Sequence, residues 1–486
     1  MQAWFPKAVV VLGITLAIWT VLLFPLDTAN RHACSSSVPA SYCSFTLPAM
    51  QLWYSCFIAN AALTFVVIPF AMFYYEADSE LSTGQRWVHA VMWELATIVT
   101  FGLILGICYA LVGYVEYPIV GLASGFVPVS ELSSNSTSPV PFDYCVVPGT
   151  HDYAGQLCDA INGDVTHDTW RLRCSFPVYL IAMSATAGWL LFMVFAGVGM
   201  VALPLDMLRE FIGRPRATIT HSEYIKRAQG LGMRAKDIKD VTDTLKKDRE
   251  GRGARKWRTA FRRIQQQLLD LEQDSKALEL VYPQGEDPDY SWAVTVMLFY
   301  LKLLLAMVSA VLSVCWLLQV VLYIFTNPPI TPFLNTFFIT LDHVFPLFGT
   351  VAFTVFCFYL IAVTIKGNTK VGLSLLLFTV RPMKPGATLM NDFLFNVALV
   401  LLSTNAAIQF CAQAFALYAN ESAIHEIWGN QIAHLIGMKY LYQLNVFVYC
   451  LFIFVGLTLI FTLIRRPSKW KRLSSEEREE AAYGAT

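Results

Sequence analysis

Long apolar runs alternate with polar stretches along the chain, and this pattern predicts the fold. Crossing the hydrocarbon core of a bilayer takes about 20 helical residues, and the runs are of that length or longer. They lie at 8–26, 50–74, 89–114, 176–205, 292–326, 337–365, 391–418 and 440–464. We therefore expect an all-α, polytopic bundle of about eight transmembrane helices.

Composition supports a membrane protein and gives no sign of an enzyme. Apolar residues make up 56% of the chain and charged residues only 14%, against about 25% charged in soluble domains. The sequence contains no P-loop, no dinucleotide-binding glycine pattern, no nucleophile elbow and no HExxH motif. We expect a non-enzymatic protein without a cofactor or a metal.

The positive charges are distributed unequally between the two sides of the predicted bundle. If 207–290 is cytosolic, alternation of the loops places 30 of the 35 Lys and Arg residues in the cytosol. Lys302 falls within a span, and four residues fall outside: Arg31, Arg171, Arg173 and Lys439. Cytosolic loops of membrane proteins carry such an excess of Lys and Arg. Both termini are therefore expected in the cytosol.

The same orientation places two glycosylation sequons and five of the 11 cysteines outside. The sequons begin at Asn135 and Asn420, and glycans are expected on residues that face the lumen. The outer cysteines are Cys34, Cys43, Cys145, Cys158 and Cys174. In an oxidising lumen the simplest disulfides join Cys34 to Cys43 and Cys145 to Cys158. The alternative is that these cysteines are reduced and incidental.

The polar segment 207–290 carries two helical patterns. Apolar positions recur at alternating spacings of four and three residues, as in a coiled-coil seam. They are Tyr224, Ala228, Leu231, Ala235, Ile238, Thr242 and Leu245, then Trp257, Phe261, Ile264, Leu268, Leu271, Ser275, Leu278 and Tyr282. Gly251-Arg252-Gly253 between them favours a turn. We expect a cytosolic antiparallel helical hairpin whose arms are each about 40 Å long.

Charge within this segment is divided between its two ends. Residues 209–263 hold 17 basic and 7 acidic side chains, whereas 264–290 hold 1 basic and 7 acidic. Aromatic residues interrupt a basic patch of Arg252, Arg255, Lys256, Arg258, Arg262 and Arg263. Such a patch suits anionic lipid headgroups or an acidic partner segment. The alternative is a solvated helix face, and nucleic acid is not expected because no recognised nucleic-acid-binding fold accompanies the charge.

Polar side chains inside the spans are costly there and are candidate functional residues. Glu94 and Lys302 lie at similar depths with opposite charges, which favours an ion pair between helices. The alternative is that Lys302 snorkels and that Glu94 faces cytosolic water. Asn405, Gln409 and Gln413 are spaced at four and share one helical face. Such amides either join membrane helices or line a hydrated cavity.

Several long segments match a known family in order. They are PLDTANRHAC (25–34), VIPFAMFYYE (67–76), GVGMVALPLD (197–206), RPRATITHSEYIK (214–226), YPQGE (282–286) and PMKPGATLMNDFLFNVALVLL (382–402). From about residue 2 to 464 the chain resembles the limb-region-like membrane protein family, above all its lipocalin-interacting membrane receptor (LIMR) branch.

This resemblance implies a multi-span protein without an agreed catalytic motif. Members are linked to lipocalin uptake, to lysosomal cobalamin export beside an ABC transporter, and to receptor trafficking. They usually begin with one more span upstream, so the resemblance leaves the orientation of the N-terminus open.

We expect four parts along the chain. They are a transmembrane half, 1–206, with four spans and an outer loop at 115–175; the cytosolic hairpin, 207–290; a second half of four spans, 291–465; and a cytosolic tail, 466–486.

The expected function is a non-enzymatic uptake receptor or transporter subunit for a small or lipophilic ligand. It would act at the plasma membrane or in an endomembrane compartment such as the lysosome or vacuole. Its partners would be membrane lipids and a separate transporter or trafficking protein. The alternative is a membrane scaffold, or a trafficking or signalling regulator, that transports nothing.

Overall fold

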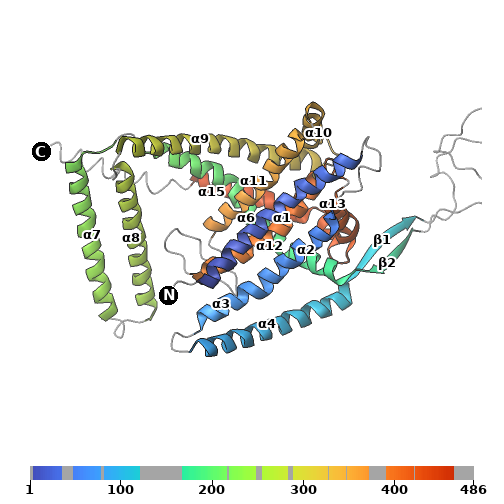
Figure 1. The fold of residues 1–486 in the computed structure, drawn as a ribbon, viewed down its shortest axis with the longest axis horizontal. Helices are drawn as coiled ribbons and strands as arrows, with labels where there is room; N and C mark the ends of the chain where they lie inside the picture. The colour runs from blue at the N-terminus through green and yellow to red at the C-terminus, as the bar shows by residue number, and fades with distance from the viewer. Residues whose placement is uncertain are drawn as a thin grey trace, which may run out of the picture. The chain divides into compact units, whose positions relative to one another are not determined.

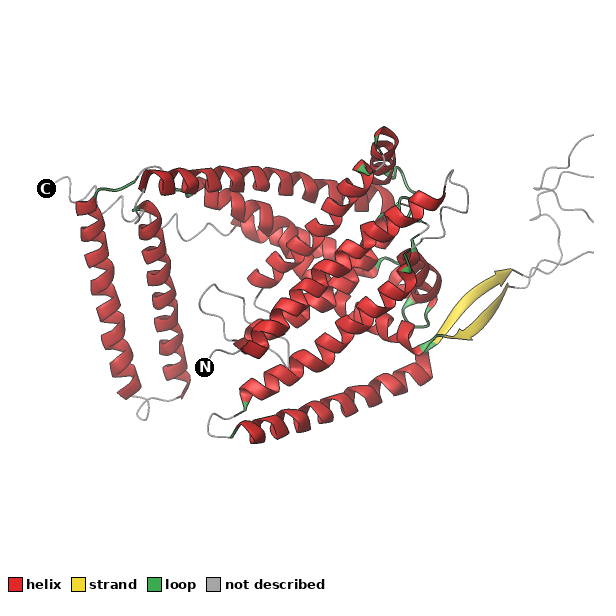
Figure 2. Ribbon diagram, viewed as in Figure 1, coloured by secondary structure: helices red, strands yellow, loops and turns green. Residues whose placement is uncertain are grey.

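Helices dominate the structure, as Figure 2 shows. The computed structural model describes residues 4–35, 47–77, 82–120, 167–215, 218–247, 254–282, 288–326, 328–345, 347–371, 390–420 and 422–464. Within these ranges eight helical segments are long and apolar enough to cross a bilayer, and one pair of short strands forms the only sheet. The predicted all-α polytopic bundle is therefore confirmed.

The spans follow the apolar runs closely. Two of them continue through a π-helical turn, η2 or η4. The spans are α1 (Trp4–Ser35), α2 with η2 and α3 (Ala49–Ala62, Leu63–Val67, Ile68–Glu76), α4 (Thr83–Val112), α6 (Phe176–Ile212), α9 with η4 (Pro288–Gln319, Val320–Ile324), α11 (Phe348–Lys370), α12 (Met390–Ala414) and α15 (Val446–Ile464).

The apolar run at 337–365 is divided between two helices. α10 (Phe333–Val344) ends before Phe345, which has an extended backbone with φ −152° and ψ 119°. The proline that follows, Pro346, disfavours helical geometry at the residue before it for steric reasons. α11 alone is therefore the sixth span, and α10 packs against it.

α12 is the central helix of the larger of two compact units, which contains Met1–Gly199 and Leu317–Thr486. Most of α12 is buried, and α1, α2, α3 and α11 pack against it. α6 also approaches α12 closely, because a Cβ atom at Gly188 would lie 2.1 Å from the carbonyl oxygen of Leu402. Small residues allow membrane helices to approach in this way.

Three π-helical turns in the described part of this unit all contact α12. They are η2, η4 and η5 (Glu426–Gln431). A π-helical turn inserts an extra residue into a helix and is often found at functional sites. Each of these three irregularities therefore lies in a segment that contacts α12.

The smaller unit, Met200–Trp316, contains the predicted hairpin. Its arms are α7 (His221–Lys247) and α8 (Ala254–Val281), which pack side by side (Figure 1). The rings of Tyr224 and Tyr282 stack at 4.4 Å, and Leu245, Ile264 and Leu278 are buried. The hairpin and most of its seam are confirmed.

Two predicted seam positions are exposed. Leu268 is 54% exposed, and Ala235 is also exposed, although it lines the space between the arms. Small side chains leave space elsewhere between the arms. A cavity of about 280 Å³ is lined by Ala228, Gly232, Ala235 and Ser275 among others.

The strands belong to the larger unit. β1 (Tyr114–Val120) follows α4, and β2 (His167–Arg173) precedes α6. They pair antiparallel with Glu116 opposite Arg171. Between α12 and α15 the chain forms short helical turns: α13 (Ala423–His425), η5, η6 (Ile432–His434) and α14 (Lys439–Gln443).

Candidate functional site

The amides of α12 bond to the helices around it. The side-chain nitrogen of Asn60, on α2, donates to the side-chain oxygen of Asn405 at 2.9 Å, and the Asn405 amide donates to the Ser184 hydroxyl of α6 at 3.3 Å. Asn60 also donates to the carbonyl of Leu401 at 3.1 Å. Asn405 therefore joins three helices at one depth in the bundle.

The two other amides bond at successive turns of α12. The indole N–H of Trp189 donates to the side-chain oxygen of Gln409 at 2.8 Å. Gln413 donates to the side-chain oxygen of Asn445, just before α15, at 2.6 Å. Of the two sequence alternatives, this geometry matches amides that join helices rather than amides that line a hydrated cavity.

The partners of these amides were missed from the sequence. Asn60 is 1% exposed, and its position in an apolar run was the available signal. Trp189 and Ser184 gave no signal, because aromatic and hydroxyl side chains are ordinary in membrane helices. Which side chain meets which amide depends on the neighbours of α12.

The predicted ion pair between Glu94 and Lys302 is wrong. Lys302 donates to Glu210 at 2.9 Å; both residues belong to the smaller unit. The long Lys302 side chain can extend toward the end of α6, where Glu210 lies, as in snorkelling. Glu94 does not face water either: it is 5% exposed, and among the described residues neither of its carboxylate oxygens has a hydrogen-bond partner.

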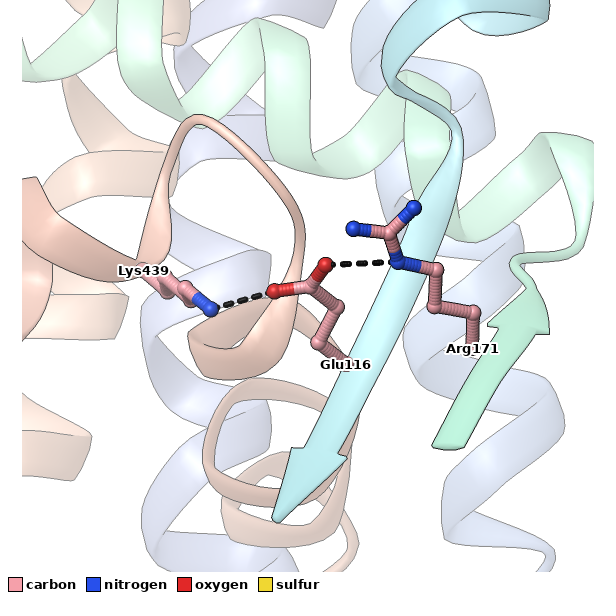
Figure 3. A network of polar contacts seen from close by, with 3 residues as sticks. All are labelled: Glu116, Arg171 and Lys439. Carbon is pink, nitrogen blue, oxygen red and sulfur yellow. Dashed lines mark hydrogen bonds and ion pairs between the residues drawn. The ribbon is translucent and has the colours of Figure 1, made fainter. Parts of the chain in front are cut away.

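A second polar cluster lies outside the spans, at the base of the strand pair (Figure 3). One carboxylate oxygen of Glu116 accepts from Arg171 at 2.9 Å, and the other accepts from Lys439. The side chains of Glu116 and Lys439 are 12% and 18% exposed, whereas that of Arg171 is 68% exposed. The contact between Glu116 and Lys439 is therefore the protected part of the cluster, which we name the outer clamp.

Backbone contacts set the geometry of the outer clamp. The N–H of Ile436 donates to the carbonyl of Tyr114 at 2.9 Å, and Val115 forms an isolated bridge with Leu435. Gly437 then adopts a φ of +85°, which glycine allows without the strain of a side chain. This turn brings Lys439 to Glu116, 323 positions away in the chain.

The charges of the outer clamp stabilise each other. The hydrogen bond from Lys439 holds the pKa of Glu116 below its ordinary value, with a smaller effect from Arg171. The hydrogen bond to Glu116 raises the pKa of Lys439. Both groups are therefore charged at neutral pH. The sequence placed Arg171 and Lys439 outside but did not single out Glu116, whose only signal was its position at the start of the outer loop.

The predicted disulfides and one sequon lie largely outside the described residues. Cys43, Cys145, Cys158 and Asn135 belong to undescribed segments, and Cys34 is described only as part of the α1 backbone. Cys174 is a buried free thiol, and burial raises its pKa, which makes it less reactive. Asn420 lies exposed in the turns after α12, so it is accessible to a glycan.

The basic patch lies mainly on α8. Arg255, Lys256, Arg258, Arg262 and Arg263 fall within the helix by its backbone, and Arg252 lies outside the described residues. The helical spacing expected for the patch is therefore present. Its binding of lipid or an acidic partner stays a prediction.

Comparison with known proteins gives matches along nearly the whole chain. The family profile described as "LMBR1-like membrane protein" matches residues 1–250 and 233–460. A LIMR family protein of Oryza sativa subsp. japonica is 43% identical over 98% of this chain and 93% of its own length. One from Arabidopsis thaliana is 41% identical over 98% and 92%, and one from Dictyostelium discoideum 30% over 97% and 92%. No solved structure matches.

Proposed function

Because the chain belongs to the LMBR1-like, or LIMR, family of membrane proteins, we propose that it is a non-enzymatic uptake receptor for a small or lipophilic ligand. It acts with a separate transporter or trafficking protein rather than as a complete transporter. The outer clamp is the single observation that carries this proposal.

The outer clamp supports a receptor because it anchors the strand pair of β1 and β2. Glu116 on β1 is held to Lys439 in the C-terminal half of the chain. A strand pair held in this way has a fixed orientation, which reduces the conformational entropy lost on binding. The ligand or a partner ectodomain binds there.

The bonded amides of α12 support a role as a subunit rather than a complete transporter. Polar groups that line a substrate path must exchange water for substrate. Asn405, Gln409 and Gln413 instead bond to neighbouring helices. Moving the ligand across the membrane is therefore the task of a separate protein.

The hairpin of α7 and α8 supports the proposed contact with a separate transporter or trafficking protein. The Lys and Arg distribution of the sequence supports a cytosolic position for the hairpin and for both termini. The hairpin docks the trafficking or transporter partner at the plasma membrane or in the endomembrane, lysosomal or vacuolar system.

Uptake of two probes tests this proposal: a fluorescent fatty acid and a fluorescent sterol, each carried by albumin. Cells that lack the protein are complemented with wild type or a variant, and binding on ice is measured separately from uptake at growth temperature. Lys439→Met should lower both, because it releases the outer clamp. Leu278→Asp should lower uptake alone, because it opens the hairpin. Arg171→Met, at the exposed part of the cluster, is the matched control and should change little.

Two results would contradict the proposal. If purified wild type in liposomes moves the same probe without a partner, the protein is a complete transporter. If removal of the protein leaves binding and uptake of both probes unchanged but alters the distribution of other membrane proteins, it is a scaffold or a trafficking regulator.

A further inference from the structure

Glu94 is the one ionisable side chain that α4 buries. α4 has two buried residues among those described, Ala90 and Glu94. Glu94 lies about 16 Å along the helix from its start at Thr83, well inside the span. It is 5% exposed, and neither carboxylate oxygen has a hydrogen-bond partner among the described residues.

α3 and the π-helical turn η2 pack against α4. η2, Leu63–Val67, has no ionisable side chain. Those on α3 are Tyr74, Tyr75 and Glu76, at its far end, and those on the same part of α4 are Arg86 and His89. One ring nitrogen of His89 accepts from the indole of Trp93 at 3.1 Å. None of these groups is hydrogen-bonded to Glu94 in the described structure.

A buried carboxylate without a partner cannot remain ionised at an acceptable cost. Removing an isolated carboxylate from water costs many kcal/mol, and the group takes up a proton instead. A calcium or magnesium ion is a poor alternative, because these ions need several oxygen ligands. Glu76, near the end of α3, is the one carboxylate on α3 and η2.

We propose that Glu94 is a proton-binding site inside the membrane, at the contact of α4 with α3 and η2. With the proton bound, the neutral side chain packs between the helices. Without it, the carboxylate draws water or a cation into the contact, and α4 separates from α3. α4 continues through Gly113 into β1, so proton binding would also act on the element that carries Glu116.

This proposal goes beyond the receptor function and does not depend on it. A ligand bound at the strand pair and a proton bound at Glu94 occupy different parts of the chain. Failure of the probe uptake experiment therefore leaves the proton site intact, and loss of the proton site leaves the receptor proposal intact.

Dicyclohexylcarbodiimide tests the site, because this apolar reagent modifies protonated carboxyl groups in hydrocarbon surroundings. The carboxyl group adds across the carbodiimide, and the adduct rearranges to a stable N-acylurea with no leaving group. Purified full-length protein in detergent is treated over a pH series, and the Glu94 peptide is quantified by mass spectrometry. We expect modification at acidic pH that decreases about tenfold for each pH unit above the midpoint.

Two variants serve as controls. Glu94→Gln should lose the modification entirely. Glu223→Gln, an exposed residue of the hairpin, should keep it unchanged. A water-soluble carbodiimide should modify Glu223 but not Glu94. The proposal is overturned if folded wild type is unmodified at Glu94 at acidic pH, or if the modification is the same at every pH. The wild-type result decides the matter even where Glu94→Gln does not fold.

Discussion

Single polar side chains join the helices of this bundle at defined depths. Lipid offers no hydrogen bonds, so an amide in a span needs a protein partner or a water-filled cavity. Asn405 bonds to α2 and α6, Gln409 bonds to α6, and Gln413 bonds to Asn445 just before α15. Their spacing was readable from the sequence, because it needs only the period of one helix. Their partners were not, because these depend on which helices surround α12.

Replacing Asn405 with Leu should destabilise the bundle by about 1–3 kcal/mol, because the Asn60 amide loses one of its acceptors and Ser184 loses its donor. Thermal unfolding of purified protein in detergent measures the change. Thr97→Val is the matched control, since the Thr97 hydroxyl is exposed and bonds only within α4. Equal melting temperatures for the two variants would refute the joining role of Asn405.

The outer clamp should be sensitive to acid. Because Lys439 lowers the pKa of Glu116 in the folded state, the stabilisation is present above the ordinary carboxyl pKa of 4.5 and is lost as pH falls through the lowered value. The raised pKa of Lys439 maintains the pair up to about its ordinary value of 10.5. Glu116→Gln should therefore lower the melting temperature at neutral pH.

The same variant should melt like wild type only in acid below the lowered pKa of Glu116, where the carboxyl group of the folded protein becomes protonated. Arg171→Gln should lower the melting temperature less than Lys439→Gln at neutral pH, because Arg171 is the more exposed partner. A difference between wild type and Glu116→Gln that persists unchanged into acid would contradict a role for the charge.

At the scale of elements, close contacts between helices decide which ones pack together. α6 and α11 approach through a glycine on each side. A Cβ atom at Gly367 would lie 1.8 Å from the carbonyl oxygen of Phe195, and one at Gly199 would lie 1.9 Å from that of Val363. Both distances are far below any real contact. The backbones therefore touch where no side chain intervenes.

Gly367→Ala should lower stability by roughly 1–3 kcal/mol, because the new methyl group forces two backbones apart. Gly106→Ala is the matched control: nothing lies near a Cβ there, and alanine favours a helix over glycine by about 1 kcal/mol. The two variants should therefore change the melting temperature in opposite directions. A melting temperature for Gly367→Ala equal to or above that of wild type would show that α6 and α11 can separate at no cost.

The seam of the hairpin gives a second prediction at this scale. Leu278 is 8% exposed and Leu268 is 54% exposed, on the same helix. Leu278→Asp buries a charge and should open the hairpin, whereas Leu268→Asp should leave it closed. Limited trypsin digestion of the full-length protein reports the difference, because both arms are rich in Lys and Arg. Equal digestion rates for the two variants would contradict the assignment of Leu278, rather than Leu268, to the seam.

The sequence predicted elements better than it predicted their irregularities. Apolar length alone predicted eight spans, because a bilayer fixes the length of a helix that crosses it. Pro346 in the sixth run was a readable break. The π-helical turns were not readable, since they depend on packing against α12. β1 and β2 were missed because each is 7 residues long and the partner strands lie far apart in the chain.

At the scale of the whole molecule, the main feature is its orientation in the membrane, that is, which loops face the cytosol. With 207–290 inside, 30 of 35 Lys and Arg are cytosolic and both sequons are outside. These signals have different origins, because positive charge controls insertion and glycosylation needs access to the lumen. Their agreement favours the orientation more than either signal alone.

Labelling from both sides tests this orientation. Met233, 65% exposed on α7, is replaced by Cys and treated with a membrane-impermeant maleimide, with wild type as background. If the hairpin is cytosolic as proposed, labelling above background should occur only after permeabilisation. Glycosidase treatment should increase the mobility of wild type on a gel but not that of a variant with both Asn135→Gln and Asn420→Gln. Labelling of residue 233 in intact cells would show that the predicted side is wrong for every loop, because consecutive spans must alternate in direction.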